Sequence, residues 1–427
     1  MIAKEDVSRR AFLARAGITA GAALPYLVPG HALGARKRPG PNDRIRIGVI
    51  GVGNRAGLLI DQLPKPGQVV ALADCSLSRC EAATAKRKVT WDIYQDYRRI
   101  LDRKDIDAVI VATTDHGRVL PCVHACQAGK DVYAEKPLTL YPAEGRVLVK
   151  AARKYKRIVQ VGTQQRSMRM NQIACDLILS GKLGKISLVH GVCYGAPGRM
   201  RDFPQEAVPE KLNWDSWLGQ APARPYSSQV FPDSKWMSFI DYSGGDTTNW
   251  GGHGLDQIQW PLGMSLTGPV EFWPIEGGLR GAVGFRYANG VAVQLDLPHS
   301  DLQAGGRFIG EKGSIDIWRN NFKLDAPGVT VDLPPREEVQ KWRDEVALWQ
   351  AEFHMGHWLE CIVSRKMPNA DVEIGHRSIT VCHLVNITRR LNRRLKWDPV
   401  KEVFVGDAEA NALANRPRRK GWELPKV

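Results

Sequence analysis

The 427-residue chain lacks the sequence features of several protein classes. After the first 35 residues it has no run of about 18 apolar residues, so we expect no membrane-spanning helix and no stable insertion in a membrane. Its eight cysteines include no Cys-x-x-Cys pair and no zinc-binding spacing, so we expect no metal and take free thiols as the default. With 43% hydrophobic and 25% charged residues, the composition excludes a disordered protein and suits two globular domains.

Basic residues outnumber acidic ones by 60 to 45, which gives a formal net charge of +15. Such an excess indicates nucleic-acid binding when it is concentrated and interleaved with aromatic side chains. The dense basic clusters of this chain lie at residues 36–38, 389–396 and 416–420, and none has that aromatic pattern. Nucleic acid is therefore not an expected partner.

The N-terminal segment has the pattern of an export signal. Residues 8–13 read Ser-Arg-Arg-Ala-Phe-Leu, and the weakly apolar residues 14–28 follow, interrupted by Arg15 and Pro25. A twin arginine ahead of such a stretch is typical of the twin-arginine pathway. We predict that residues 1–35 are a removable signal, that the machinery of this pathway is a partner, and that the mature protein is periplasmic or otherwise extracytoplasmic. Because the pathway carries folded proteins, a cofactor would be bound before export.

The next segment predicts a dinucleotide-binding unit. A β-rich run over residues 44–50 leads into Gly51-Val-Gly-Asn-Arg-Ala56; a helical stretch over 58–63 and a second strand over 68–74 follow. Gly51 permits the tight turn, Gly53 lets the backbone approach a pyrophosphate, and the small Ala56 allows close packing of helix on strand. Asp74, 21 residues after Gly53, is placed to accept hydrogen bonds from the ribose. The acid favours NAD, while the nearby Ser76 and Arg79 leave NADP open.

The alternation of strand and helix continues up to residue 163. Strands are expected over 107–113, 131–135 and 157–162, with helices over 119–129 and 143–155 between them. This order predicts a doubly wound parallel sheet, and such sheets bind ligands at the carboxyl ends of their strands. Residues 36–163 are therefore predicted to be a Rossmann domain. Its cofactor-binding candidates are Gly51, Gly53, Asn54, Arg55, Ala56, Asp74, Thr113, Thr114, His116, Glu135, Lys136, Pro137 and Gln164.

Three motifs in this order resemble the Gfo/Idh/MocA oxidoreductases. They are Gly51-Val-Gly-Asn-Arg-Ala56, Ala134-Glu-Lys-Pro137 and Gly244-Gly-Asp-Thr-Thr-Asn-Trp-Gly-Gly-His-Gly-Leu-Asp256. Two further segments, Val161-Gly-Thr-Gln-Gln-Arg-Ser167 and Asn369-Ala-Asp-Val-Glu-Ile-Gly-His-Arg377, are similar to the exported bacterial branch of that family. The resemblance runs from about Arg44 to the C-terminus.

The resemblance implies an α/β chain in which an α+β domain with a large, mostly antiparallel sheet follows the Rossmann domain. We assign residues 164–368 to this domain, for substrate and oligomer contacts, and residues 369–427 to a late helix, near 374–391, and a tail that return to the Rossmann domain. The β-rich runs at 186–194, 270–275, 282–297 and 306–318 fit the sheet, and Asn289-Gly290 and residues 310–313 are turn signals within it.

By the same resemblance, Lys136 would contact the reacting hydroxyl and His253 would be the acid–base histidine. A histidine near neutral pKa, helped by an ammonium group, suits the proton transfer that accompanies hydride transfer. Many relatives carry an aspartate four residues before the histidine, where this chain has Asn249. Asp256 is expected either to orient His253 or to cap the helix N-terminus. The catalytic candidates are Lys136, His253, Asn249 and Asp256.

Several other residues are candidates for substrate contacts. With Lys136 and His253, we assign Gln165, Arg166 and Trp250 to substrate binding. Trp214, Trp217 and Trp236, in the aromatic-rich insertion 198–243, either stack on sugar rings or pack a domain edge. His354-x-x-His357 has metal-ligand spacing, but without a second ligand cluster we interpret it as part of a structural helix.

The sequence therefore predicts an NAD(P)-dependent oxidoreductase that acts on a carbohydrate or polyol and holds its cofactor without releasing it. Two alternatives stay open. One is a redox-neutral glycosidase or lyase that works through a keto-sugar intermediate, and the other is a cofactor-bound binding module without turnover. The family resemblance also implies a homo-oligomer.

Overall fold

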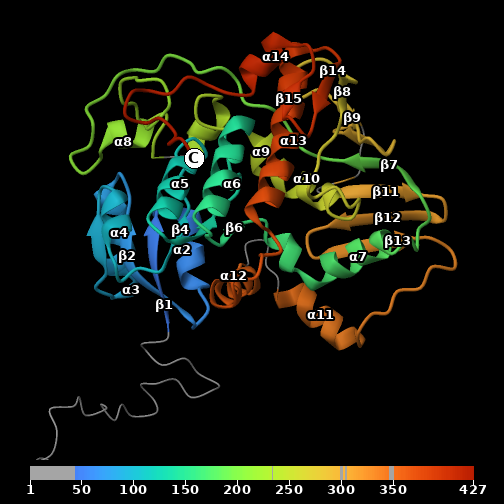
Figure 1. The fold of residues 1–427 in the computed structure, drawn as a ribbon, viewed down its shortest axis with the longest axis horizontal. Coiled ribbons are helices and arrows are strands. Elements are labelled where there is room, and N and C mark those ends of the chain that lie inside the picture. Colours follow the sequence, from blue (N-terminus) through green and yellow to red (C-terminus); the bar gives the residue numbers. More distant parts are fainter. Residues whose placement is uncertain (1–43, 233, 299–301, 303–304, 346–350) are drawn as a thin grey trace, which may run out of the picture. The chain divides into compact units, whose positions relative to one another are not determined.

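The computed structural model describes residues 44–427 except 233, 299–301, 303–304 and 346–350 (Figure 1). The predicted export signal, residues 1–35, lies outside the described residues. Among the helices that are described, none has the length and apolar character needed to cross a membrane.

The first half of the described chain forms a six-stranded sheet whose pairings are all parallel, in the order β3-β2-β1-β4-β5-β6. Its strands are β1 (Ile45–Ile50), β2 (Gly67–Ala73), β3 (Asp92–Tyr94), β4 (Ala108–Val111), β5 (Asp131–Ala134) and β6 (Val159–Val161). The helices between them are α2 (Asn54–Asp61), α3 (Leu77–Arg87), α4 (Arg98–Asp102), α5 (Val119–Gln127) and α6 (Pro142–Lys154). This order confirms the predicted doubly wound sheet, although the pattern analysis missed the short β3.

The central strands form because their apolar residues run without alternation. The four residues of β4 and the four of β5 are all buried, as expected for parallel strands covered on both faces. The strand order reverses between β1 and β4, which opens a crevice at their carboxyl ends. The glycine turn that starts at Gly51 lies at this reversal.

The second half contains a nine-stranded sheet in the order β13-β12-β11-β7-β10-β9-β8-β14-β15, in which only the β7–β10 pairing is parallel. Its strands are β7 (Ile186–Gly191), β8 (Glu271–Pro274), β9 (Val283–Arg286), β10 (Ala292–Leu295), β11 (Gly306–Gly310), β12 (Gly313–Trp318), β13 (Asn321–Asp325), β14 (Leu395–Asp398) and β15 (Val403–Phe404). The sheet confirms the predicted mostly antiparallel architecture. Both predicted turns are hairpins, since Asn289 and Gly290 lie between the paired β9 and β10 and Gly310 pairs with Gly313.

The remaining elements pack between and around the two sheets. They are η2 (Gln164–Ser167), α7 (Arg169–Leu179), α8 (Trp214–Leu218), η3 (Ser234–Ser238), α9 (Asp246–Asn249), α10 (Gly251–Gln259), α11 (Arg336–Glu345), α12 (Glu352–Ser364), α13 (Val372–Leu391) and α14 (Ala408–Leu413). The late helix predicted near 374–391 is α13, and it packs against both α6 and α10 (Figure 1). Arg146 on α6 forms ion pairs with Glu373 and Glu402, which fix this return to the Rossmann domain. The exact domain boundaries at 163 and 368 stay predictions.

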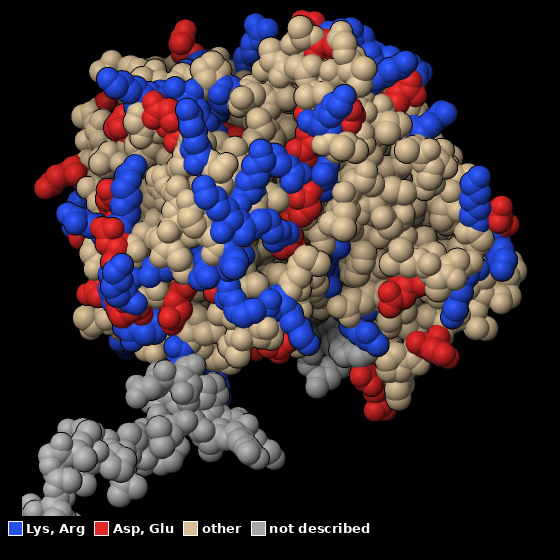
Figure 2. All heavy atoms as spheres, viewed as in Figure 1, with Lys and Arg blue, Asp and Glu red and all other residues tan. Residues whose placement is uncertain are grey.

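The face of the molecule drawn in Figure 2 carries charges of both signs. Figure 2 shows Lys and Arg spread over the visible face, with Asp and Glu among them. All eight cysteines are free, and Cys122 and Cys126 are fully buried packing residues of α5.

Candidate functional site

A cavity of about 1120 Å³ lies at the carboxyl ends of the parallel strands. Residues of the Rossmann domain line one part of it, and residues of α9, α10 and the turn between β12 and β13 line another. A deep pocket at the reversal point of a doubly wound sheet is the expected ligand site of this fold.

The glycine turn shapes the floor of the cavity. Gly51 has φ +84°, and a Cβ there would lie 2.7 Å from the backbone nitrogen of Thr113, so no other residue fits. Gly53 precedes α2 and offers no side-chain cap, and a Cβ at Gly53 would meet only the end of the Arg79 side chain, at 3.8 Å. The N–H groups at the start of α2 are therefore accessible to a pyrophosphate.

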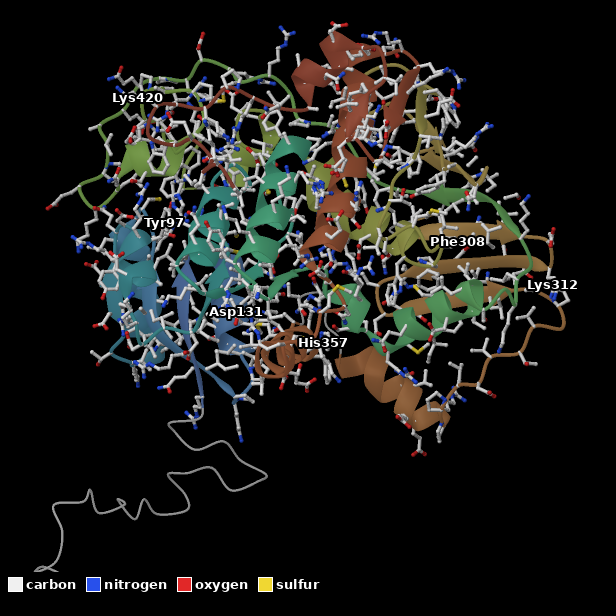
Figure 3. The ribbon with its side chains drawn as sticks, in the orientation of Figure 1. Tyr97, Asp131, Phe308, Lys312, His357 and Lys420 are labelled. Atoms are coloured by element: carbon white, nitrogen blue, oxygen red, sulfur yellow. The ribbon has the colours of Figure 1, made fainter. Side chains whose placement is uncertain are left out.

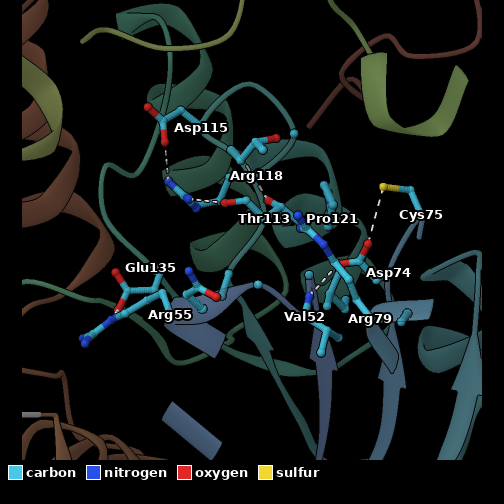
Figure 4. Close-up of a pocket in the computed structure, with 18 of the residues that line it drawn as sticks. Val52, Arg55, Asp74, Cys75, Arg79, Thr113, Asp115, Arg118, Pro121 and Glu135 are labelled. Carbon is cyan, nitrogen blue, oxygen red and sulfur yellow. Dashed lines mark hydrogen bonds and ion pairs between the residues drawn. The ribbon is translucent and has the colours of Figure 1, made fainter. Parts of the chain in front are cut away.

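Asp74, directly after β2, lies beside this turn (Figure 4). One carboxylate oxygen accepts a hydrogen bond from Val52 N at 2.7 Å and the other accepts one from Ser76 N at 2.8 Å. These bonds fix the carboxylate in the cavity wall, where a ribose hydroxyl could donate to it. The arrangement fits the nucleotide role predicted for Asp74.

Lys136, directly after β5, lies on the opposite side of the turn. Its Nζ donates to Asn249 Oδ1 at 2.7 Å and to the Asn249 carbonyl oxygen at 3.3 Å. Burial lowers the pKa of Lys136 to about 8, although Glu135 and Asp115 favour its charged form. The Lys136–Pro137 peptide bond is cis.

Glu135 is held beneath Lys136 by an ion pair. Its carboxylate accepts from Arg55 Nε at 2.7 Å and from the backbone nitrogen of Lys136 at 2.8 Å (Figure 4). Burial alone would raise the pKa of Glu135, but Arg55 and Lys136 hold it below the usual value. The carboxylate therefore stays charged and orders the strand end that carries the lysine.

His253, on α10, faces the same cavity and is 4% exposed. Its Nδ1 is buried without a hydrogen-bond partner among the described residues. Burial, followed by the charges of Arg319, Lys136 and Arg55, lowers the pKa of His253 well below its ordinary value. The imidazole is therefore neutral at pH 7 and can accept a proton.

Gln164, at the start of η2, presents a second orphaned polar atom to the cavity. Its buried Oε1 also lacks a partner among the described residues. A buried acceptor without a partner is costly, and a bound ligand with a donor group would satisfy it. The glycine turn, Asp74 and these two orphaned atoms fit a dinucleotide that crosses the cavity from Asp74 to Lys136.

Family comparisons agree with this geometry. Residues 45–163 match the oxidoreductase family model for the NAD-binding Rossmann fold, and residues 197–424 match the model for the C-terminal alpha/beta domain. The chain belongs to the Gfo/Idh/MocA oxidoreductase family.

Among curated proteins, the chain is similar to inositol 2-dehydrogenase from Salmonella typhimurium, with 30% identity over 36% of this chain and 46% of that protein. The chain thus spans about half the length of such relatives. Inositol 2-dehydrogenase 2 from Saccharopolyspora erythraea is 25% identical over 71% of this chain and 84% of its own length.

Two solved structures share the fold of this Gfo/Idh/MocA chain. The WlbA dehydrogenase from Bordetella pertussis, solved in complex with NADH and UDP-GlcNAcA, has a TM-score of 0.62 and 18% identity over 83% of this chain and 98% of its own. The aldose-aldose oxidoreductase from Caulobacter crescentus has a TM-score of 0.58 and 17% identity over 83% of this chain and 99% of its own.

Most residues predicted for the site of this Gfo/Idh/MocA chain line the cavity. They are Gly51, Gly53, Asn54, Arg55, Asp74, Thr113, Thr114, Glu135, Lys136, Pro137, Gln164, Asn249, Trp250 and His253. Ala56 lies beneath the turn, fully buried, which suits the packing role predicted for it.

Besides Ala56, four predicted site residues lie outside the lining, and the predicted roles of three of them, His116, Arg166 and Asp256, need correction. His116 is fully buried, its Nε2 lies 2.7 Å from the Trp217 carbonyl oxygen, and burial lowers its pKa to about 3. Gln165 is 1% exposed and does not line the cavity, but both of its side-chain polar atoms lack a hydrogen-bond partner among the described residues, so its substrate role stays a prediction. Arg166, predicted to bind substrate, instead donates from Nη2 to the Asp256 carboxylate at 2.8 Å. Because this carboxylate is paired with Arg166, Asp256 neither orients His253 nor caps the helix.

The Arg166–Asp256 pair is structural, because the two side chains are only 4% and 1% exposed. We expect Asp256→Asn to lower the free energy of unfolding by about 3–5 kcal/mol, since it leaves a buried guanidinium without its counter-charge. Urea denaturation would measure the change. The control, Glu81→Gln, breaks the exposed pair with Lys211 and should cost less than about 1 kcal/mol. Equal losses in the two variants would contradict the structural role.

Several charged residues that line the cavity were not predicted as site residues, and Arg319 and Asp115 are the two that act on His253 and Lys136. Arg319 enters from the turn between β12 and β13, and its guanidinium lies 5.5 Å from the centre of the Trp250 ring. Burial and Arg55 lower the pKa of Arg319 to about 10. Asp115 follows β4 and pairs with Arg118 at 3.7 Å (Figure 4). It also accepts a hydrogen bond from Ser243 Oγ at 2.7 Å, and burial raises its pKa. Asp115 lies between Thr114 and His116 at the end of a strand, and this position was a sequence signal from which it could have been predicted as a site residue.

The aromatic and histidine candidates are mainly packing residues. Trp214 and Trp217 stack with ring centres 4.6 Å apart in a buried cluster, although Trp217 and Trp236 also reach the cavity. The ring nitrogens of His354 lie 2.7 Å from Ser167 Oγ and 2.8 Å from the Val161 carbonyl oxygen, which hold α12 against the sheet. The described residues contain no cluster of metal-ligating side chains.

Proposed function

We propose that the chain is an NAD(P)-dependent oxidoreductase that transfers a hydride between a carbohydrate or polyol and a tightly bound nicotinamide cofactor. The observation that carries the proposal is the convergence of Lys136 and His253, from different domains, on the cavity that contains the glycine turn. The family's Rossmann fold and the dehydrogenase relatives support it.

The two side chains divide the proton chemistry between them. The cofactor, when bound, supplies a hydride acceptor. The neutral imidazole of His253 accepts the proton of the substrate hydroxyl, and the Lys136 ammonium stabilises the negative charge that develops on that oxygen. As the oxygen loses its proton and the carbon loses a hydride, the carbon–oxygen single bond becomes a carbonyl. The reverse sequence reduces a carbonyl.

Asp74 supports NAD as the preferred form, because its fixed carboxylate would repel a 2′-phosphate. Arg79 lies in the same part of the cavity and keeps NADP as an alternative. Mass spectrometry of the denatured, purified protein should detect a nicotinamide dinucleotide, and a sugar and polyol screen followed by nicotinamide absorbance should identify the substrate. The proposal would be refuted if the denatured protein releases no dinucleotide and the native protein also fails to bind added NADH.

Asn249 favours one alternative, a redox-neutral glycosidase or lyase. An amide contacts Lys136 at the position where the family resemblance implies an aspartate, so the acidic partner expected of a dehydrogenase relay is replaced. Transient oxidation of a sugar would acidify the adjacent C–H, allow elimination, and return the hydride. Cleavage of a chromogenic glycoside without net NADH change would select this function. A binding module would instead show cofactor absorbance changes that survive Lys136→Ala and His253→Ala.

The Asn249 contact leads to a pH prediction. The Lys136 ammonium is lost as pH rises through its pKa of about 8, so activity should fall on the alkaline side. Asn249→Asp places a carboxylate on Nζ and should raise the Lys136 pKa by about 1–3 units, moving that fall to higher pH. The kcat–pH profile would measure the shift. Asn249→Ser, which adds no charge, is the matched control, and an unmoved alkaline limb in Asn249→Asp would contradict the role.

The setting of the enzyme is also proposed. The Ser-Arg-Arg-Ala-Phe-Leu motif supports export of the folded protein by the twin-arginine machinery to the periplasm, with the cofactor retained inside. A homo-oligomer follows from the family resemblance. N-terminal sequencing of the secreted form and light scattering would test the two statements.

A further inference from the structure

The last residues of the chain form a strap across the Rossmann half. After α14 the tail runs above α5 toward α8, as the red trace in Figure 1 shows. Trp422 near its end lines the cofactor cavity, more than 280 positions away in sequence from Lys136. Nothing in the pattern of residues 415–427 predicts this position.

Three arginines fasten the strap. Arg416 donates to the carbonyl oxygens of Asp241 at 3.1 Å and His116 at 3.4 Å. Arg418 pairs with the fully buried Glu144 of α6. Arg419 donates to the Gly219 carbonyl oxygen at 2.7 Å and also pairs with Asp215. The basic cluster 416–420 is thus used for internal anchoring.

The position of Trp422 identifies which end of the cavity it covers. The guanidinium of Arg98, at the start of α4, lies 5.5 Å from the centre of the Trp422 ring. Figure 3 places Lys420 of the tail and Tyr97, next to Arg98, on the same side of the molecule. The sheet order puts this β3 end and Asp74 on one side of the glycine turn, and Lys136 on the other. A dinucleotide whose nicotinamide reaches Lys136 therefore has its adenosine beside Trp422.

We propose that Trp422 forms a wall of the adenosine pocket and that the strap it belongs to slows release of the dinucleotide. The inference rests on the proposed function and extends it to cofactor retention. The indole offers a stacking surface to a purine, and Arg98, which also lines the cavity, packs against the ring and restricts its movement. Release then requires the tail to detach charge-assisted bonds, which are stronger than neutral ones.

The test compares Trp422→Ala with Trp422→Phe and with Trp273→Ala. Trp273 is a half-buried tryptophan that also packs against arginines, but it lies on β8 and does not line the cavity. We expect Trp422→Ala to release bound NADH roughly 10- to 100-fold faster in fluorescence-monitored dilution, the effect of losing one stacked base contact. Trp422→Phe should restore much of the retention, and Trp273→Ala should match the unsubstituted protein.

Two further measurements test which end of the dinucleotide the strap covers and whether the strap itself slows release. Binding of AMP should weaken in Trp422→Ala while binding of nicotinamide mononucleotide is unchanged, because the strap covers only the adenosine end. Arg419→Gln, which keeps the indole but loosens the strap, should also accelerate release. If Trp422→Ala releases NADH no faster than Trp273→Ala, the proposed role of the strap is wrong and the proposed function is unaffected. Failure of the unsubstituted protein to bind NADH would overturn the proposed function as well.

Discussion

Lys136→Met is expected to lower kcat by about 10²–10⁴-fold while leaving the nicotinamide cofactor bound. Methionine preserves the length and the apolar stem of the side chain but removes the ammonium that contacts Asn249 at 2.7 Å. The developing negative charge on the substrate oxygen then loses the cation proposed to stabilise it. Steady-state kinetics, together with the dinucleotide content of the purified variant, would measure both parts of the expectation.

The matched control is Lys211→Met. Lys211 pairs with Glu81 at an exposed position and does not line the cavity, so its loss should leave kcat unchanged. A Lys136→Met variant that turns over like Lys211→Met would exclude the lysine from the chemistry. Loss of bound cofactor in Lys136→Met, rather than loss of turnover, would assign the residue to binding instead.

The Rossmann half was predictable because its signals are local. Each strand is a short apolar run followed by a helix, and parallel strands joined in this way bring their carboxyl ends to one edge. Glu135, Lys136 and Gln164 could therefore be assigned to the cavity from their positions after strands. The three-residue β3 was missed because all of its residues are partly or fully exposed and give no apolar run.

For the second sheet, the sequence predicts the mostly antiparallel class but not which strands pair. Its hairpins have local turn signals, but the parallel pairing of β7 with β10 joins strands about 100 residues apart. β13 was missed because its residues are partly buried or exposed, and β15 because it is two residues long. β14 was missed because its only two buried residues, Leu395 and Trp397, are each followed by a charged one. Such strands form only because the sheet already present offers them an edge.

The errors at the site have a common physical cause. Helical spacing placed Asp256 beside His253 on one face but could not reveal that Arg166, 90 residues away, already occupies its carboxylate. Arg319 and Trp422 reach the cavity from a distant hairpin and from the tail, so only tertiary packing brings them there. Sequence patterns locate groups at element ends, while pairing between domains decides which of them remain available to a ligand.

His253→Asn is expected to lower kcat by about 10²–10⁴-fold, because it removes the proposed proton acceptor while keeping a polar side chain of similar width. The effect should be present at every pH between about 6 and 8, since the pKa of His253 lies well below the ordinary value of about 6.5 and the unsubstituted imidazole is neutral throughout. His190→Asn, on β7 outside the cavity, is the control. Added imidazole should partly rescue His253→Ala.

The charges around His253 make this prediction sharper. Burial and the cations Arg319, Lys136 and Arg55 hold the imidazole in its neutral form, so removing one cation should raise its pKa. The residual activity of Lys136→Met should therefore fall on the acidic side at a higher pH than the activity of the unsubstituted protein. An acidic limb near pH 6.5 in the unsubstituted protein that disappears in His253→Asn would contradict a neutral resting imidazole. Unchanged turnover in His253→Asn would assign the proton transfer to another group, and Asp115 is a remaining candidate in the cavity wall.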